Sequence, residues 1–341
     1  MIADLFLRTV PPLLQAAYDN GDVKLYGSVL RHANGQIAGF LQETSGLSKI
    51  VSLAGSGPLA PLKLVGQGIQ IVQSEQIKSG ISVVQQGIET LNQLQIANLA
   101  LSAAGIGVSV IGFAVMNAKI DGVRDEVRGL GVKLDRLLDE FARDRTERID
   151  DMIDRLRGLA HRVDSRWAMS SDKAESGWHR DADEADTLGH FFSGRARRLL
   201  DARPDAVAEA TPLLDASAMA SGLRVGALAL SGESAAAISV ARDDTARLER
   251  LTGAIGAADL AREWMAAPEW QRAPGSEDAG HALARASADA RTLAATLRAR
   301  EAVAATRAAP LLALERKGIH PRDWLGAARS EEEAPVLLLA E

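Results

Sequence analysis

The feature that most constrains this 341-residue chain is an uncharged, mostly apolar run from Leu94 to Met116. It lies inside a longer window without charge, Thr90 to Ala118. A helix of about 20 apolar residues is long enough to cross the hydrocarbon core of a bilayer. The run can therefore fold in one of two ways, as a membrane-spanning helix or as a buried element of a water-soluble core.

Small and polar residues follow one face of this run, whereas its other faces carry Ile, Leu, Val and Phe. With steps alternating between four and three residues, that face reads Gln95, Asn98, Ser102, Gly105, Ser109 and Gly112. Helices in lipid meet through small and polar residues, because apolar side chains gain nothing by leaving an apolar solvent. The pattern favours a membrane or oligomer contact. The alternative is a soluble hairpin in which Gly105 and Gly107 interrupt the helix.

Apolar residues at heptad spacing come directly after the run, and Glu126, Lys133 and Glu140 flank them. Such a pattern predicts a coiled coil that brings copies of the chain together as a homo-oligomer. A second apolar series, from Ile77 to Leu91, precedes the run at the same spacing. We call the series after the run the coiled-coil seam: Ile120, Val123, Val127, Leu130, Leu134, Leu137 and Phe141.

Charge is unevenly distributed along the chain. Residues 1–118 carry six basic and six acidic side chains, out of 39 and 45 in the whole chain. The predicted fold is mainly α, with a coiled-coil-like rod of long helices around the apolar run. Three regions are expected: 1–62 with a β-hairpin at 23–43 and an apolar Gly/Pro connector, 63–170 with the long helices, and 171–341 as an Ala/Arg-rich helical domain.

The hairpin prediction rests on Asn34-Gly35, which lies between two β-prone stretches. This dipeptide is the strongest short-range signal for a hairpin turn. Two strands alone are marginally stable in water. We therefore expect the hairpin to pack on a helix, on another chain or on a third strand.

In the C-terminal half, a polar break is expected at residues 170–187. Helices are expected at 184–202, 204–230, 233–266 and 277–308, followed by a short terminal helix. Five residues near the break could suggest an oxygen/nitrogen metal cluster: His179, Asp181, Asp183, Asp186 and His190. Their spacing fits no recognised set of ligands, and acidic residues also favour a helix start through its dipole. No metal site is predicted.

Composition excludes several classes of function. There are no cysteines, so disulfides and thiolate metal sites are absent, and the net charge of −6 gives no general attraction to nucleic acid. Gly55 to Gly57 lacks the following Gly-Lys-Ser/Thr of a phosphate-binding loop. No catalytic motif or cofactor motif has a usable context. We expect a protein that is not an enzyme and that binds no cofactor.

The N-terminus, Met1 to Gln15, lacks the features of a signal peptide, so synthesis in the cytoplasm is expected. Basic residues are more frequent after the apolar run than before it, which would keep the C-terminal side in the cytoplasm. That topology requires some 90 residues to cross the membrane without a signal. Conditional insertion by a soluble form fits better.

Two functions follow from these patterns. The first is a self-associating helical protein that associates with a lipid bilayer and inserts conditionally, as a pore-forming or membrane-disrupting effector. This layout is similar to that of α-helical pore-forming toxins, in which an apolar head sits on long helices. The second is a non-enzymatic coiled-coil scaffold or adaptor, soluble or membrane-anchored, which presents its terminal regions to protein partners.

Overall fold

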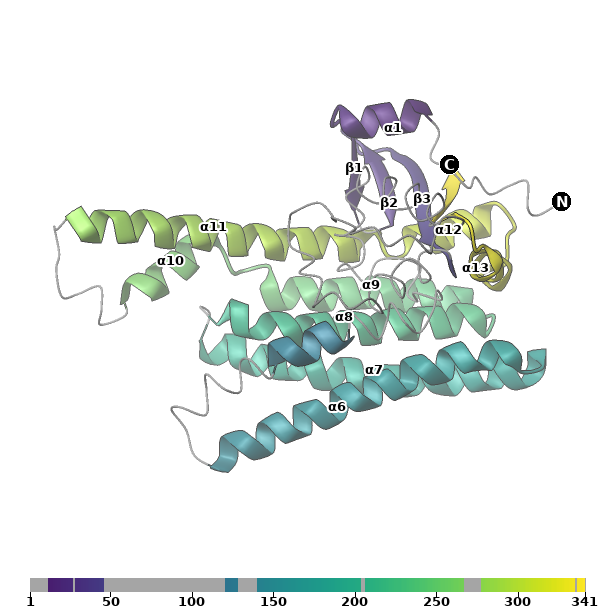
Figure 1. The fold of residues 1–341 in the computed structure, drawn as a ribbon, viewed down its shortest axis with the longest axis horizontal. Coiled ribbons are helices and arrows are strands. Elements are labelled where there is room, and N and C mark those ends of the chain that lie inside the picture. Colours follow the sequence, from purple (N-terminus) through teal and green to yellow (C-terminus); the bar gives the residue numbers. More distant parts are fainter. Residues whose placement is uncertain are drawn as a thin grey trace, which may run out of the picture.

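A computed structural model of the chain describes residues 12–26, 28–45, 120–127, 140–203, 206–266, 277–334 and 336–340. Within them helices predominate and four strands form one antiparallel sheet (Figure 1). The mainly helical class and the small N-terminal β element are therefore confirmed. The elements are α1 (Pro12–Asp19), β1 (Val23–Tyr26), β2 (Val29–His32), β3 (Ile37–Glu43), α6 (Glu140–Ser165), the 3-10 turn η2 (Arg166–Ala168), α7 (Ser171–Ala202), α8 (Val207–Leu230), α9 (Ser234–Thr252), α10 (Ala257–Ala266), α11 (Glu277–Thr306), α12 (Ala309–Arg316), α13 (Pro321–Ser330) and β4 (Val336–Ala340).

The predicted turn at Asn34-Gly35 joins β2 to β3. The His32 amide donates to the Gln36 carbonyl at 2.8 Å, and the Gly35 amide donates to the His32 carbonyl at 2.9 Å. Gly35 has φ +88°, a conformation in which a Cβ would be strained. The connection between the two strands, residues 33–36, thus turns at a left-handed glycine. The hairpin prediction was right, but its region contains three strands, because β1 and β2 form a second hairpin.

The far end of the chain completes this sheet. β4 pairs antiparallel with β3, so that Leu338 lies opposite Leu41 and Val336 opposite Glu43. The sheet order is β1-β2-β3-β4. Residues near the two ends of the chain therefore share one sheet, and the short terminal helix expected at this end is followed by a strand. The division into regions 1–62, 63–170 and 171–341 stays a prediction. Residues 336–340 of the third region form a strand that pairs with β3 of the first region.

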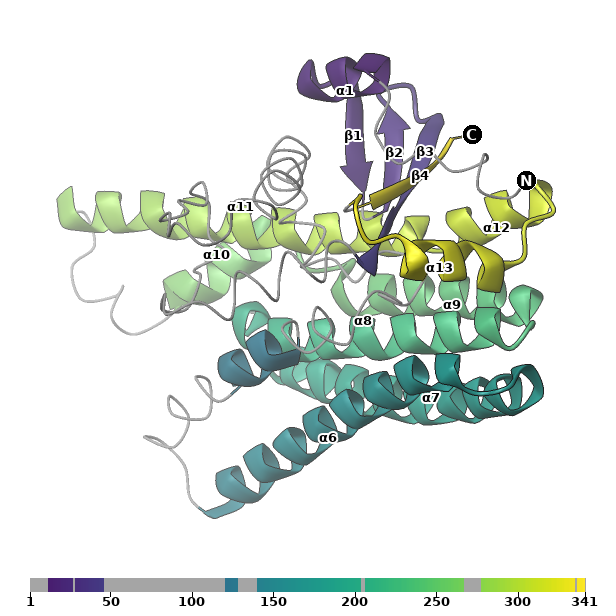
Figure 2. The same ribbon diagram turned by 45° about the vertical axis from the view of Figure 1, so that its right-hand side comes forward.

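Both faces of the sheet are covered. Alternate strand residues such as Phe40 and Leu337 join the large core shared with the helices. Their neighbours Leu41 and Leu338 form a smaller core, and Leu14, Ala17 and Tyr18 of α1, all partly buried, pack against it. A strand that is buried on both faces reads as a continuous apolar run, as the sequence VLLLA of β4 does. The sheet is thus a layer between α1 and the helical body (Figures 1 and 2).

The helical body is centred on α7 and α8, which make the most extensive helix–helix contact among the described elements. Figure 2 shows α6, α7, α8 and α9 lying side by side, with α11 between them and the sheet. The polar break expected at 170–187 is wrong, since α7 is helical from Ser171. Its small residues Ala174, Ala182 and Ala185 are buried with Trp178 at helical spacing. A stripe of alanines carries a weak apolar signal although it packs closely.

Other helix boundaries in this half are close to expectation. The expected helices 204–230 and 277–308 correspond to α8 and α11. The expected helix 233–266 is two helices, α9 and α10, which are separated around Gly253 to Gly256. A glycine at each end of this short stretch weakens helix propensity, which explains the interruption.

A straight rod from residue 120 to α6 is excluded by two ion pairs. Arg124 contacts Asp154 at 3.0 Å, and Asp121 contacts Arg157. Residues 30 positions apart on one straight helix would lie about 45 Å from each other. The later residue, Arg124, contacts the earlier position in α6, Asp154, whereas Asp121 contacts the later position, Arg157. Residues 120–127, which are helical, therefore run antiparallel to α6. The coiled-coil character that we predicted for this region is not shown.

The sheet that joins the two ends of the chain gives the first prediction. Leu338→Ala should lower the free energy of unfolding by about 2–5 kcal/mol, because it removes a buried side chain that is 1% exposed. Leu13→Ala is the matched control, since Leu13 on α1 is 87% exposed, and it should change stability by less than about 0.5 kcal/mol. Chemical denaturation measures both. Equal effects would contradict the pairing of β4 in the core.

Candidate functional site

The candidate site is the place where residues 120–127 dock on the helical body, and we call these residues the docking segment. It is the described part of the chain that comes next after the apolar run 94–116. Ile120, Val123 and Val127 are 0, 7 and 6% exposed and belong to the large core with Ile153 and Leu156 of α6. Their spacing of three and four residues places them on one face of the helix. The first three seam residues therefore pack within the chain.

Apolar burial holds the segment more strongly than its ion pairs do. Burying a Val or Ile side chain is worth about 1.5–3 kcal/mol. In the ion pairs Arg124–Asp154 and Asp121–Arg157 the carboxylates are 51 and 58% exposed. Such surface pairs contribute at most about 1 kcal/mol. The ion pairs thus set the antiparallel register, and the three apolar side chains supply most of the docking free energy.

A carboxylate of α8 is paired with a guanidinium of α11. Asp215 accepts two hydrogen bonds from Arg300 of α11, at 2.8 and 3.0 Å. Loss of hydration raises the pKa of Asp215 to about 6, although the positive charge of Arg300 opposes this shift and the negative charge of Glu126 adds to it. Glu126 belongs to the docking segment. Asp215 and Arg300 therefore tie α8 to α11 through a bidentate ion pair.

Sequence analysis did not single out Asp215. A signal is present, however, because Asp215 is the one charged residue between Ala210 and Leu223. A lone carboxylate in an apolar helix needs a partner, and its partner Arg300 is 85 positions away in the sequence. The pair could not be assigned from local spacing.

The other predicted site residues are placed as follows. Phe141 lies in α6. Leu130, Leu134 and Leu137 of the seam lie outside the described residues, as do all six residues of the face along the apolar run: Gln95, Asn98, Ser102, Gly105, Ser109 and Gly112. The contacts predicted for these nine residues stay predictions.

The acidic and histidine residues around position 180 all lie on α7. Asp181 is buried and receives hydrogen bonds from Arg166, which raises the pKa of that guanidinium, and Asp186 pairs with Arg224 at 2.6 Å. The part of the chain that the structure describes contains no group of three His, Cys, Asp or Glu side chains suited to a metal ion. Asp181 and Asp186 fasten α7 to its neighbours.

A second buried polar cluster joins α8, α9 and the end of α11. Arg307 is 7% exposed and donates to the Ser221 hydroxyl at 2.5 Å, and Ser221 also bonds Asp244. Burial lowers the pKa of Arg307, and Asp244 partly offsets this effect. The next residue toward the N-terminus, Thr306, donates to the Tyr26 carbonyl of β1 at 3.2 Å. The cluster thus connects the helical body to the sheet, and its enclosed serine has no access for a substrate.

A membrane-length apolar helix is present within the described residues, although it is not the one expected. Glu209–Leu230 of α8 has 22 residues and a mean hydropathy of 1.3, and 78% of its most apolar window is buried. A buried core helix of a soluble protein can be equally long and apolar, so this helix alone is weak evidence for a membrane span. The apolar run from Leu94 to Met116 lies outside the described residues.

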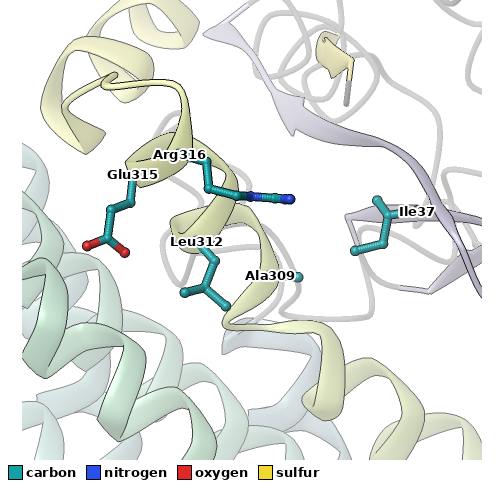
Figure 3. Close-up of a pocket in the computed structure, with 5 residues that line it drawn as sticks. All are labelled: Ile37, Ala309, Leu312, Glu315 and Arg316. Carbon is teal, nitrogen blue, oxygen red and sulfur yellow. The ribbon is translucent and has the colours of Figure 1, made fainter.

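A hollow of about 500 Å³ lies between β3 and α12. Its described lining residues are Ile37, Ala309, Leu312, Glu315 and Arg316 (Figure 3). Figure 3 shows Arg316 extending toward Ile37, whereas Glu315 points to the other side of α12. An apolar wall with one cation specifies no particular class of ligand.

Comparison of the chain with protein-family models, curated proteins and solved structures finds no match.

The docking contact gives the second prediction. Ile120→Ala should destabilise the docked segment by about 2–5 kcal/mol, because the side chain is fully buried. Gly122→Ala on the same turn should stabilise it by up to about 1 kcal/mol, since a Cβ there meets no atom within 4 Å and alanine favours a helix. Hydrogen exchange of the amides of residues 120–127 reports both changes. Faster exchange in both variants would contradict the described packing.

Proposed function

We propose that this protein is a self-associating helical protein that holds an apolar segment in a soluble state and inserts it conditionally into a lipid bilayer. The observation that carries the proposal is the position of the docking segment. It follows the apolar run after Asn117 to Lys119, and it is held on the body by three apolar side chains and two exposed ion pairs. A short attachment of this kind can be released without unfolding α7 and α8.

The organisation of the helical body supports the same proposal. α8 is apolar and mostly buried, and α6, α7 and α9 pack around it. Each of these surrounding helices has one buried face and one polar face. A buried apolar helix with amphipathic neighbours suits a soluble form, and the same arrangement can reorganise at a lipid surface, where amphipathic helices lie with their apolar faces in the interface.

A scaffold is the second candidate, and the sheet is the observation that favours it. β3 and β4 bring residues 37–43 and 336–340 together, and the sheet is fastened to the body through Thr306 and Tyr26. A closed body of this kind is suited to presenting fixed surfaces to protein partners. In this alternative the apolar run packs in a core and does not meet lipid.

The third prediction separates the two candidates by liposome leakage. The wild-type protein should release dye from liposomes. Gly105→Leu and Gly112→Leu should reduce release, because bulk on the small-residue face prevents close helix contact in lipid. Ile111→Arg should reduce it further, since an arginine at mid-bilayer costs about 2.5–3.5 kcal/mol on insertion scales.

Thermal melting in buffer is the paired measurement. In the membrane proposal all three variants keep the melting temperature of the wild type. If the run is instead packed in a soluble core, the leucine variants overpack it and lower the free energy of unfolding by about 1–3 kcal/mol. If the wild-type protein causes no leakage with any lipid composition or pH, the membrane proposal is rejected and the scaffold is the remaining candidate.

Self-association through the later part of the seam is the fourth prediction. Leu134→Asp should lower the sedimentation coefficient, because a charge would be buried at the contact between copies. Lys133→Asp is the matched control, since it introduces the same side chain one position off the seam and should leave the coefficient unchanged. Equal coefficients for the wild type and both variants would show that these seam residues pack within one chain.

A further inference from the structure

We propose that the hollow between β3 and α12 binds a single-chain fatty acid, whose acyl chain lies on the apolar wall and whose carboxylate is held by Arg31 of β2 and Lys24 of β1. The lining of the hollow supplies one cation, Arg316, and does not by itself select a ligand. The selection comes from the neighbouring strands, which add two further cations in register with the wall. Binding at this hollow does not depend on the membrane function proposed above.

Arg31 and Lys24 lie on the face of the sheet that is turned toward the helical body. Ile37, which lines the hollow, packs against the large core on this face. Arg31 is the register partner of Ile37, and Lys24 is the register partner of Arg31. Residues directly opposite each other in an antiparallel pair point to the same face, with Cα atoms about 4.5–5.5 Å apart. The two cations therefore form a row with Ile37, and their long side chains can reach the rim of the hollow.

A β-bulge brings Arg31 and Ile37 together. Leu30 lies opposite Gly39, and the next residue of β2 lies opposite Ile37. Ala38 is therefore the extra residue of β3. Bulges re-aim side chains and are frequent beside functional sites. In a regular ladder the small Ala38 would lie opposite Arg31, whereas the bulge places a large apolar side chain beside the cation.

Arg31 and Lys24 form a like-charged pair that lacks a counterion. Like charges directly opposite each other in a sheet are destabilising. Within the part of the chain that the structure describes, neither cation makes an ion pair, and Arg31 lies over the Tyr26 ring at 5.9 Å. The Nε atom of Arg31 is buried and has no hydrogen-bond acceptor among these residues. A bound carboxylate would replace the repulsion by attraction and would give the guanidinium the acceptor that it lacks.

The wall of the hollow suits an alkyl chain. Ile37, Ala309 and Leu312 present apolar surface, and Figure 3 shows Glu315 pointing to the other side of α12. Arg316, in the last turn of α12, offsets the negative end of the helix dipole. The volume of about 500 Å³ lies in the lower part of the range of about 300–1,000 Å³ that is usual for pockets with one small ligand. It therefore favours a single acyl chain over the two chains of a bilayer lipid.

Isothermal titration calorimetry of the full chain with dodecanoate tests the proposal, at concentrations below those at which dodecanoate forms micelles. We expect saturable binding of one dodecanoate per chain. Two control compounds separate the head from the chain. Dodecyltrimethylammonium has the same chain with a positive head, and acetate has the carboxylate without the chain. Both should bind at least about tenfold more weakly than dodecanoate, because each lacks one of the two contributions.

Two variants separate ligand binding from a structural role. Arg31→Gln should weaken dodecanoate binding by about tenfold, and Lys24→Gln by about threefold, since Lys24 is exposed and its charge is screened by water. Without ligand, Lys24→Gln should keep or raise the melting temperature, because it removes the repulsion. Arg197→Gln is the matched control, since it removes the same charge from an exposed position of α7 that pairs locally with Asp201, and it should bind dodecanoate as the wild type does.

The proposal is overturned if the wild type shows no saturable binding, or if either control compound binds as tightly as dodecanoate. Wild-type affinity in the double variant of Arg31→Gln and Lys24→Gln would also overturn it. An equal loss of affinity in Arg197→Gln and Lys24→Gln would do the same, because it would reveal a general effect of net charge. These titrations contain no liposomes, so their outcome is separate from that of the leakage assay.

Discussion

The packing of Ile120, Val123 and Val127 against the helical body is the interaction on which the functional account depends. These side chains anchor the chain at the point where the apolar run has just ended. The ion pairs to Asp154 and Arg157 fix the direction of the segment relative to α6 but contribute less free energy, since both carboxylates are largely exposed. The run is thus attached through a contact of three side chains and some eight residues.

The rest of the molecule is fastened independently of this contact. Trp178 and Trp324 are buried, and the Trp178 indole donates to the Val163 carbonyl at 3.1 Å, which ties the start of α7 to the end of α6. Arg322 of α13 lies over the Trp178 ring and also pairs with Glu175 at 3.0 Å. Further along, Arg307 and Thr306 link the body to the sheet. Release of the docking segment leaves these connections in place.

Patterns with a regular period were predictable from the sequence. The helical class, the Asn34-Gly35 turn and the boundaries of α8 and α11 follow from turn chemistry and apolar spacing. The buried face of α6 has the same kind of regular period, since Leu156, Leu159 and Val163 recur at helical spacing and are buried. The start of α7 was missed, because Ala174, Ala182 and Ala185 form its buried stripe and the surrounding residues are polar. Small residues pack closely while contributing little to an apolar pattern.

Contacts between distant parts of the chain could not be predicted. Leu338 meets Leu41 across almost the whole sequence, and Arg300 meets Asp215 across 85 residues. The apolar spacing of Ile120, Val123 and Val127 showed that this face needs a partner but could not identify it, since another copy and α6 of the same chain present similar apolar surfaces. The bidentate pair between Asp215 and Arg300 is a further consequence of this packing, and it became visible only with the fold.

The most direct test of the account is the environment of the apolar run itself. A single cysteine at Val110 can carry an environment-sensitive fluorophore, because the chain has no other cysteine. The account predicts that liposomes shift the emission to the blue and that nitroxide groups placed on lipid tails quench it, while the five tryptophans, all at position 167 or later, are quenched little. Emission that stays unchanged when liposomes are added, and that resists quenching from the lipid phase, would contradict the account and show that the run remains within a soluble core.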